Sequence, residues 1–253
     1  MKLHRSLSAG NIRLLILSLV ATAVVSLLPI ASHATVDWND GFEYADDAAL
    51  DVVWDMSCRG NPGISTLRRF SGSKSLRLVY NGTAGIDPGA GGCFMHRYLP
   101  SPSTTLYTRI HMYMENFTVN STGTKVAANG PYTGYPSFWW GMLFGQSALS
   151  VTVQGVIFDN GSSGSENVFG GQIPQNTWVC LETRLTMSAP GVNNGIVQAW
   201  INGTQVINKT NQRMRAATLN KNNSPTAQFQ LVTLYIQHGR GVIYYDDYAV
   251  SRD

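Results

Sequence analysis

The stretch 106–114 alternates strictly between two kinds of side chain. The first kind is apolar or small and comprises Leu106, Thr108, Ile110, Met112 and Met114. The second kind is polar or aromatic and comprises Tyr107, Arg109, His111 and Tyr113. Because successive side chains of a strand point to opposite faces, each kind occupies its own face. The stretch is therefore predicted to be a β-strand with one face in a core.

Short alternating runs of this type recur along the chain, separated by Gly, Pro and Asn, and long 3.6-residue periodicity is absent. The runs 195–201 and 204–207 flank Asn202-Gly203, a dipeptide that favours a tight hairpin. These patterns predict an all-β fold, a jelly-roll sandwich of two antiparallel sheets. We expect it to be a single domain, residues 35–253.

Residues 1–34 have the pattern of a signal peptide. A basic start precedes the apolar run 14–31, and the small-x-small triplet 32–34 is typical of a cleavage site. The alternative is an uncleaved membrane anchor, because the apolar run is about long enough to cross a thinned bilayer. We predict cleavage after Ala34 and a secreted or periplasmic protein.

The charge of the chain depends on this leader. The full sequence has 18 Lys and Arg against 15 Asp and Glu, and the leader holds three of the basic residues and no acidic one. The remaining chain is therefore formally neutral, which removes the usual electrostatic support for binding nucleic acid. We expect a monomer, with neither nucleic acid nor, after leader removal, a membrane as its partner.

The cysteines are predicted to differ in state. Cys58 and Cys93 lie in Gly-rich, loop-like surroundings, and export permits a disulfide between them. Cys180 lies in an alternating run and is expected to be a buried free thiol. No cluster of Cys and His has the spacing of zinc ligands.

Three acidic residues lie near the two ends of the predicted domain: Glu43, Asp246 and Asp247. Terminal strands of such sandwiches often lie side by side, which would bring these carboxylates together. Together with backbone carbonyls they could bind a structural Ca²⁺. The alternative is ordinary hydrogen bonding of acidic side chains at a sheet end, and the sequence leaves both open.

The polar face of the stretch 106–114 is the first candidate site. It aligns Arg109, His111 and Tyr113 about 7 Å apart, given roughly 3.3 Å of rise per residue. A cation, a titratable ring and a phenol in one row are the groups that proton-transfer chemistry requires. A second run, 230–238, places Tyr235 and Gln237 on one face.

Lys125 lies within a long polar stretch, 115–135, of the kind that often covers a binding cleft. The alternative for Lys125 is a solvated surface lysine.

Aromatic and polar side chains on other runs are candidates for binding sugar. The stretch 136–146 is the richest in aromatic residues, and alternation sends one of its two tryptophans to the core and leaves the other as a platform. Further candidates share faces on the runs 177–187 and 195–201. The expected substrate-contacting residues are Trp139, Trp140, Trp200, Gln198, Glu182 and Arg184.

Several segments in this order resemble a known group of proteins: Phe42-Glu43, Leu106–Arg109, Trp178–Glu182, Gln198–Gly203 and Tyr245–Asp247. The chain resembles secreted concanavalin A-like jelly rolls, and among them polysaccharide lyases of the alginate, glucuronan and heparin-lyase-I kind. The resemblance implies a polysaccharide partner and β-elimination at a uronate. The same scaffold also serves glycoside hydrolases and non-catalytic sugar-binding modules.

Elimination needs a group that neutralises the uronate carboxylate, a base for the C5 proton and an acid for the leaving oxygen. The resemblance implies that Arg109 and Gln237 bind the carboxylate. It assigns His111 as the base, and Tyr113 or Tyr235 as the acid.

Lys125 is a reserve neutraliser or base in the same scheme. A hydrolase is disfavoured because it needs paired carboxylates and the chain lacks a Glu-x-Asp-x-x-Glu run. A non-catalytic carbohydrate-binding or adhesion domain is the alternative, since it needs only aromatic platforms and polar side chains.

Overall fold

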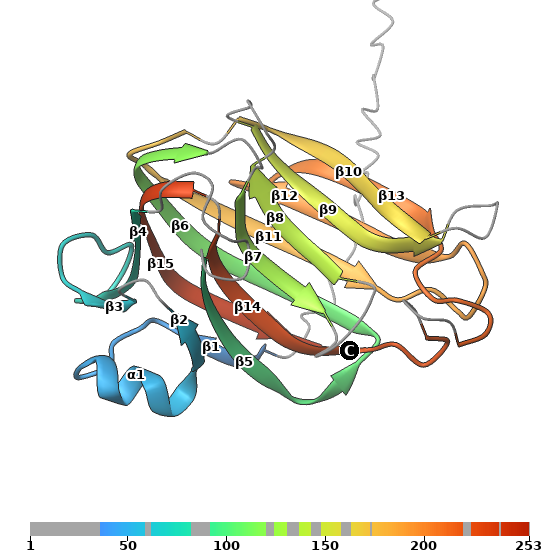
Figure 1. Cartoon of the computed structure of the whole chain (residues 1–253), viewed down its shortest axis with the longest axis horizontal. Coiled ribbons are helices and arrows are strands. Elements are labelled where there is room, and N and C mark those ends of the chain that lie inside the picture. Colours follow the sequence, from blue (N-terminus) through green and yellow to red (C-terminus); the bar gives the residue numbers. More distant parts are fainter. Residues whose placement is uncertain are drawn as a thin grey trace, which may run out of the picture. The chain divides into compact units, whose positions relative to one another are not determined.

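The computed structural model describes residues 36–58, 62–81, 92–119, 124–130, 137–142, 148–157, 163–172, 174–219, 224–237 and 239–252. These residues form two antiparallel sheets packed as a sandwich, as Figure 1 shows. The predicted all-β jelly-roll fold is therefore confirmed. Among the described residues, no helix has the length and apolar character needed to cross a bilayer.

Sheet A has the strand order β13-β12-β11-β6-β15-β4-β3, and β1 pairs with β15 outside this path. Its strands are β1 (Val36–Asp40), β3 (Gly63–Ser65), β4 (Ser75–Asn81), β6 (Thr105–Val119), β11 (Trp178–Thr186), β12 (Gly195–Ile201), β13 (Thr204–Gln212) and β15 (Gly239–Ser251). The pairing of β1 with β15 places the first and last described strands side by side.

Sheet B has the order β10-β9-β8-β7-β14-β5-β2. Its strands are β2 (Asp55–Cys58), β5 (Gly92–Ser103), β7 (Thr124–Gly130), β8 (Ser137–Met142), β9 (Ala148–Ile157), β10 (Ser163–Gln172) and β14 (Phe229–Gln237). The front sheet of Figure 1 includes β5, β14, β7, β8 and β9.

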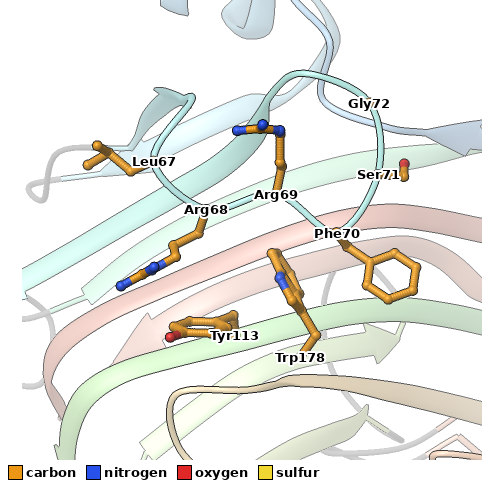
Figure 2. A pocket seen from close by; sticks show the side chains of 8 residues that line it. All are labelled: Leu67, Arg68, Arg69, Phe70, Ser71, Gly72, Tyr113 and Trp178. Atoms are coloured by element: carbon orange, nitrogen blue, oxygen red, sulfur yellow. The ribbon is translucent and has the colours of Figure 1, made fainter.

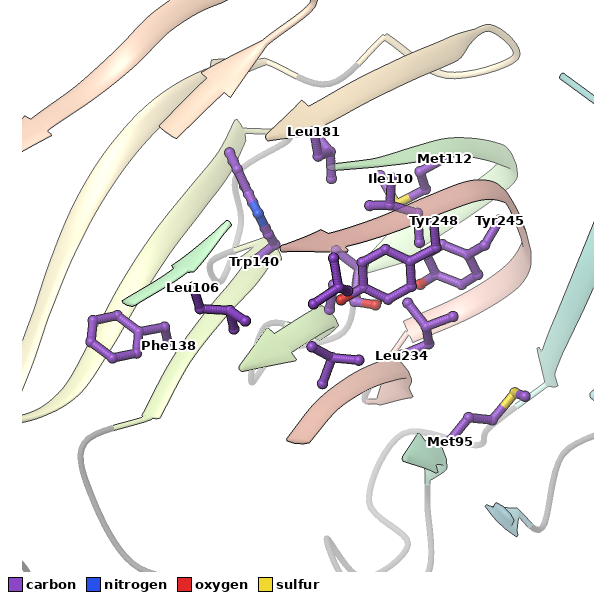
Figure 3. Packing of buried hydrophobic residues seen from close by; sticks show 14 of the residues in the cluster. Met95, Leu106, Ile110, Met112, Phe138, Trp140, Leu181, Leu234, Tyr245 and Tyr248 are labelled. Carbon is purple, nitrogen blue, oxygen red and sulfur yellow. The ribbon is translucent and has the colours of Figure 1, made fainter. Parts of the chain in front are cut away.

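The core lies between the two sheets, and alternation decides which side chains enter it. On β6, Leu106, Ile110 and Met112 are at most 3% exposed. They pack with residues of sheet B such as Leu234 and Trp140 in one apolar cluster (Figure 3). Burial of such surface stabilises by about 25 cal/mol per Å². The alternating pattern of β6 therefore determines which face of sheet A packs against sheet B.

The hairpin expected at Asn202-Gly203 joins β12 to β13. Both turn residues have positive φ, 49° and 75°, as the tight two-residue hairpin requires.

One short helix, α1 (Asp47–Val53), was not predicted. The side chain of Asp46 caps it by accepting a hydrogen bond from the Ala49 N–H at 2.9 Å.

The carboxylate of Asp40 ties the start of the fold to both sheets. Asp40 is 6% exposed and accepts hydrogen bonds from the Phe42 N–H, the Trp54 indole, the Tyr44 hydroxyl and the Arg97 guanidinium. The Arg97 ion pair measures 2.9 Å. Because Arg97 lies on β5 and Asp40 ends β1, this network links sheet B to sheet A.

The predicted disulfide has a defined backbone setting, because the register of β2 with β5 places Cys58 opposite Cys93. We predict that denatured, unreduced protein titrates with one thiol, Cys180, and that reduction releases two more. Cys180 has no disulfide partner, and burial raises its pKa to about 11, so the titration requires denaturant. Three thiols before reduction would contradict the disulfide.

Candidate functional site

The polar row of β6 lies on the outer face of sheet A. Because Ile110 and Met112 face the core, Arg109, His111 and Tyr113 point away from sheet B. On the adjacent strand β11, Cys180 pairs with His111 and Glu182 with Arg109, so the same outward face continues there.

The loop 66–74 covers part of this row. The Phe70 ring stacks on His111 with centroids 3.6 Å apart and planes 11° from parallel. The Arg68 guanidinium lies 5.3 Å from the Tyr113 ring centroid, and Tyr113 is 8% exposed. Burial lowers the pKa of His111, with the nearby Arg109 acting in the same direction and Asp247 opposing it.

A second polar group lies on the outer face of sheet B. On β14, Val232 and Leu234 enter the core, so Thr233 and Tyr235 face outward. The register pairs Thr233 with His96 of β5 and Tyr235 with Phe94. His96 Nδ1 lies 2.8 Å from the Thr233 hydroxyl oxygen.

Lys125 belongs to this second group. It precedes Val126, which is fully buried in the core, and therefore faces outward on β7. The register pairs Lys125 with Gln237 of β14 and with Gly141 of β8. The register between β7 and β14 shifts just beside it, between Leu234 and Gln237. Such bulges redirect side chains and are frequent near active sites.

Tyr245 supports this irregular segment from inside the core. It is fully buried on β15 of sheet A, and Figure 3 shows it among the core side chains. Its hydroxyl lies 2.6 Å from the Val126 carbonyl oxygen and 2.8 Å from that of Tyr235, and donates its hydrogen between them. The hydroxyl thus satisfies backbone groups where the ladder between β7 and β14 is interrupted.

Replacing Tyr245 by phenylalanine is expected to lower the free energy of unfolding by about 1–3 kcal/mol, because buried carbonyl oxygens lose their donor. Urea denaturation followed by tryptophan fluorescence measures this. Tyr244→Phe is the matched control, because the Tyr244 hydroxyl contacts side chains, with Glu115 at 3.4 Å and a hydrogen bond with Arg77, and bridges no backbone groups between the sheets. An equal loss in both variants would contradict the role assigned to Tyr245.

Burial shifts the pKa values of the sheet B groups in complementary directions. It lowers the pKa of Lys125 and raises that of Tyr235, whose shift the Thr233 hydroxyl partly offsets. Burial also lowers the pKa of His96, and Asp55, opposite it on β2, acts against this. The amine is therefore easier to deprotonate than usual, while the phenol keeps its proton. One sheet face thus carries a group suited to act as a base and a group suited to act as an acid.

The structure separates residues that the sequence analysis combined in one site. Arg109, His111 and Tyr113 lie on the outer face of sheet A, whereas Lys125 and Tyr235 lie on the outer face of sheet B. The core fills the space between the two sheets. The expectation of one combined site is therefore wrong. The apolar residues that alternate with the polar row on β6 face the core, so the row itself faces away from sheet B.

The predicted sugar-contacting residues also divide. Trp140 is 3% exposed within the core and offers no platform, which corrects that expectation. The side chain of Trp139 lies outside the described part of the structure, as does that of Gln237, the predicted ligand of the uronate carboxylate. The others lie on the outer face of sheet A, where cross-strand pairing aligns them: Glu182 with Trp200 and Arg184 with Gln198.

His96 and Thr233 were not among the predicted site residues. Alternation within 94–99 and 231–237 does place them opposite the apolar positions, but nothing in the sequence showed that these two runs are neighbours. Their pairing is a property of the strand order.

Glu43, Asp246 and Asp247 all bind the loop 66–74. Glu43 accepts hydrogen bonds from the Ser73 and Lys74 N–H groups, and Asp246 accepts from those of Phe70 and Ser71. The Ser71 hydroxyl donates to Asp247 at 2.8 Å.

In the described residues, no three His, Cys, Asp or Glu side chains are grouped as metal ligands. The carboxylates therefore fit loop anchoring, the alternative weighed for them. Binding of Ca²⁺ remains an untested prediction.

No protein-family model matches the sequence, and no curated protein matches it. Solved structures, however, share its fold. The endo-β-1,4-glucuronan lyase of the fungus Trichoderma reesei is 12% identical, with a TM-score of 0.64, and the match covers 87% of this chain and 96% of that one.

Two further structures are similar over most of both chains. The alginate lyase of Aplysia kurodai is 12% identical with a TM-score of 0.58, covering 87% of this chain and 100% of that one. The cellulose induced protein Cip1 is 17% identical with a TM-score of 0.56, covering 85% and 97%. At these identities the likeness establishes the fold, that of jelly-roll polysaccharide lyases, and leaves the chemistry to be argued from the residues.

Proposed function

We propose that this chain is a secreted polysaccharide lyase that cleaves a uronate-containing polymer by β-elimination on the outer face of sheet B. The observation that supports this most is the presence of Lys125 and Tyr235 on that face, where Tyr235 lies within the register shift between β7 and β14 and Lys125 lies at its edge. Burial favours a neutral amine in one and a neutral phenol in the other. The shared fold agrees with a polysaccharide as the partner.

In the proposed reaction, the neutral amine of Lys125 removes the C5 proton of the uronate. The electron pair of the C5–H bond forms the C4–C5 double bond, and the C4–O bond breaks. Tyr235 donates its phenolic proton to the leaving oxygen. Exchange with water then returns Lys125 to the amine and Tyr235 to the phenol.

Two neighbouring residues support these roles. Thr233 lies between His96 and Tyr235, because its hydroxyl contacts the imidazole and also lowers the pKa of the phenol. It therefore positions the acid. Gln237, opposite Lys125 in register, remains the predicted ligand of the uronate carboxylate.

The test is incubation of the purified protein with alginate, glucuronan, pectate, heparin and hyaluronan, followed by the ultraviolet absorbance of the C4–C5 unsaturated product. We expect at least one polymer to give product, and Tyr235→Phe to abolish it. Tyr107→Phe, on the outer face of sheet A, is the matched control and should retain activity.

A flat absorbance with every polymer, combined with retention of one of them, would instead indicate a sugar-binding domain. Loss of activity in Tyr107→Phe but not in Tyr235→Phe would indicate that the active site lies on the outer face of sheet A.

A further inference from the structure

A pocket of about 580 Å³ opens on the outer face of sheet A. Loop residues 67–72 form one wall, and Tyr113 of β6 and Trp178 of β11 form the floor. In Figure 2, the side chain of Arg68 extends from the loop toward Tyr113, whereas that of Arg69 extends from the loop away from Trp178. This pocket takes no part in the reaction proposed for sheet B, from which the core separates it.

The loop that walls the pocket is held in one conformation. Carboxylates from Glu43, Asp246 and Asp247 accept hydrogen bonds from its N–H and hydroxyl groups. Gly72 has φ 56°, and a Cβ at this position would lie 2.1 Å from a carboxylate oxygen of Glu43. The loop is therefore already ordered, so the binding of a ligand costs little conformational entropy in this wall of the pocket.

The pocket exposes apolar and aromatic groups, although one face of the Phe70 ring is stacked on His111. Phe70 is 48% exposed and Leu67 is 70% exposed. The centroid of the Trp178 ring lies 5.9 Å from that of Phe70 and 5.6 Å from that of Tyr113. Flat aromatic surfaces beside polar groups suit the faces of sugar rings.

The pocket also carries cations. Arg68 forms a 2.9 Å ion pair with Glu115, on a half-exposed side chain. Arg69 donates to the Thr66 carbonyl oxygen at 3.2 Å, and within the described residues no carboxylate forms an ion pair with it. Glu43 and Asp246 accept hydrogen bonds from the loop backbone, and Asp247 accepts one from the Ser71 hydroxyl. The guanidinium of Arg69 is therefore the group available to a ligand carboxylate.

An extended peptide could not bind here by adding a strand to the sheet, because that mode needs an exposed edge strand. Strands β6 and β11 are interior strands of sheet A, so their backbone hydrogen bonds are satisfied by neighbours. What the pocket offers is ring faces and a guanidinium. We propose that it is a second binding site for an acidic polysaccharide, in which a uronate ring lies against Trp178 and Phe70 and its carboxylate binds Arg69.

The experiment is affinity electrophoresis in gels containing alginate, with hydroxyethyl cellulose as the neutral polymer. Every protein carries Lys125→Ala so that alginate stays intact. We expect Arg69→Ala to weaken retardation by alginate by about three- to tenfold, as for loss of one charge-assisted hydrogen bond at a surface. Phe70→Ala should weaken it similarly. Both side chains are exposed, so the variants are expected to fold.

Arg240→Ala is the matched control, because Arg240 is an exposed arginine of the same sheet outside the pocket. It should migrate as the parent does. Unchanged retardation in both pocket variants would overturn the proposal, as would equal retardation by the neutral polymer. Because the gel measures binding alone, these outcomes do not depend on whether elimination takes place on sheet B.

Discussion

Replacing Lys125 by alanine is expected to lower the rate of elimination by about 10²–10⁴-fold, the usual contribution of a positioned base. The physical reason is that the half-buried amine on β7, whose pKa burial lowers, is the group assigned to remove the C5 proton. Initial rates of product formation measure the effect. Lys209→Ala on β13 is the matched control and should retain the parent rate.

The pH profile distinguishes the two roles open to Lys125. As the base it acts when neutral, so kcat/KM should rise with pH through a pKa below the usual 10.5 of lysine. The rate should fall only above the pKa of Tyr235, which burial raises above its usual 10.0. If Lys125 instead neutralised the carboxylate as a cation, the rate would fall as pH rose through the lysine pKa.

A rate that falls as the pH rises through the lysine pKa would contradict the role of Lys125 as the base but would still place Lys125 at the site. An alanine variant with the parent rate would remove Lys125 from the reaction altogether.

Replacing Asp40 by alanine is expected to lower the free energy of unfolding by about 3–5 kcal/mol, the range for breaking a buried ion pair from one side. The variant leaves the Arg97 guanidinium without its carboxylate and removes the acceptor of the Trp54 indole N–H. Arg97 also lies 4.0 Å from the Trp38 ring centroid, so it has little freedom to turn toward water. Urea denaturation measures the loss.

Asp37→Ala is the matched control for this prediction. Asp37 pairs with Arg252 at 2.7 Å near the surface, where such pairs contribute about 0–1 kcal/mol. A loss in Asp40→Ala no larger than in Asp37→Ala would show that the buried network around Asp40 does not hold the sheets together.

Tyr245 connects the stability of the sandwich to the candidate site. Its hydroxyl reaches from sheet A to the carbonyl oxygens of Val126 and Tyr235, which border the bulge in sheet B. The residues that flank these carbonyls include Lys125. The core thus fixes the backbone that carries both proton-transfer groups, and nothing in the spacing of Tyr245 along the chain indicates this.

Much of the fold followed from local pattern. The alternation in 106–114 identified a strand and its core face, and the inward side chains of Leu106, Ile110 and Met112 are buried as the pattern requires. The Asn202-Gly203 turn followed from the same kind of argument, because only a few residue types tolerate positive φ at both positions.

The composition of the site did not follow from pattern. Alternation gives each residue one of two faces, but it does not say which strands are neighbours or which of two tryptophans faces inward. Trp140 entered the core, and the row of Arg109 came to lie on the sheet opposite Tyr235.

The sequence by itself determined the strands, their faces and the turn chemistry, since these depend on residues close together in the chain. Only the tertiary structure decided that His96, Lys125 and Tyr235 share a surface, because β5, β7 and β14 become adjacent through pairings between distant segments. The same pairings set the burial of each side chain, and burial is the main cause of the pKa shifts on which the proposed chemistry rests.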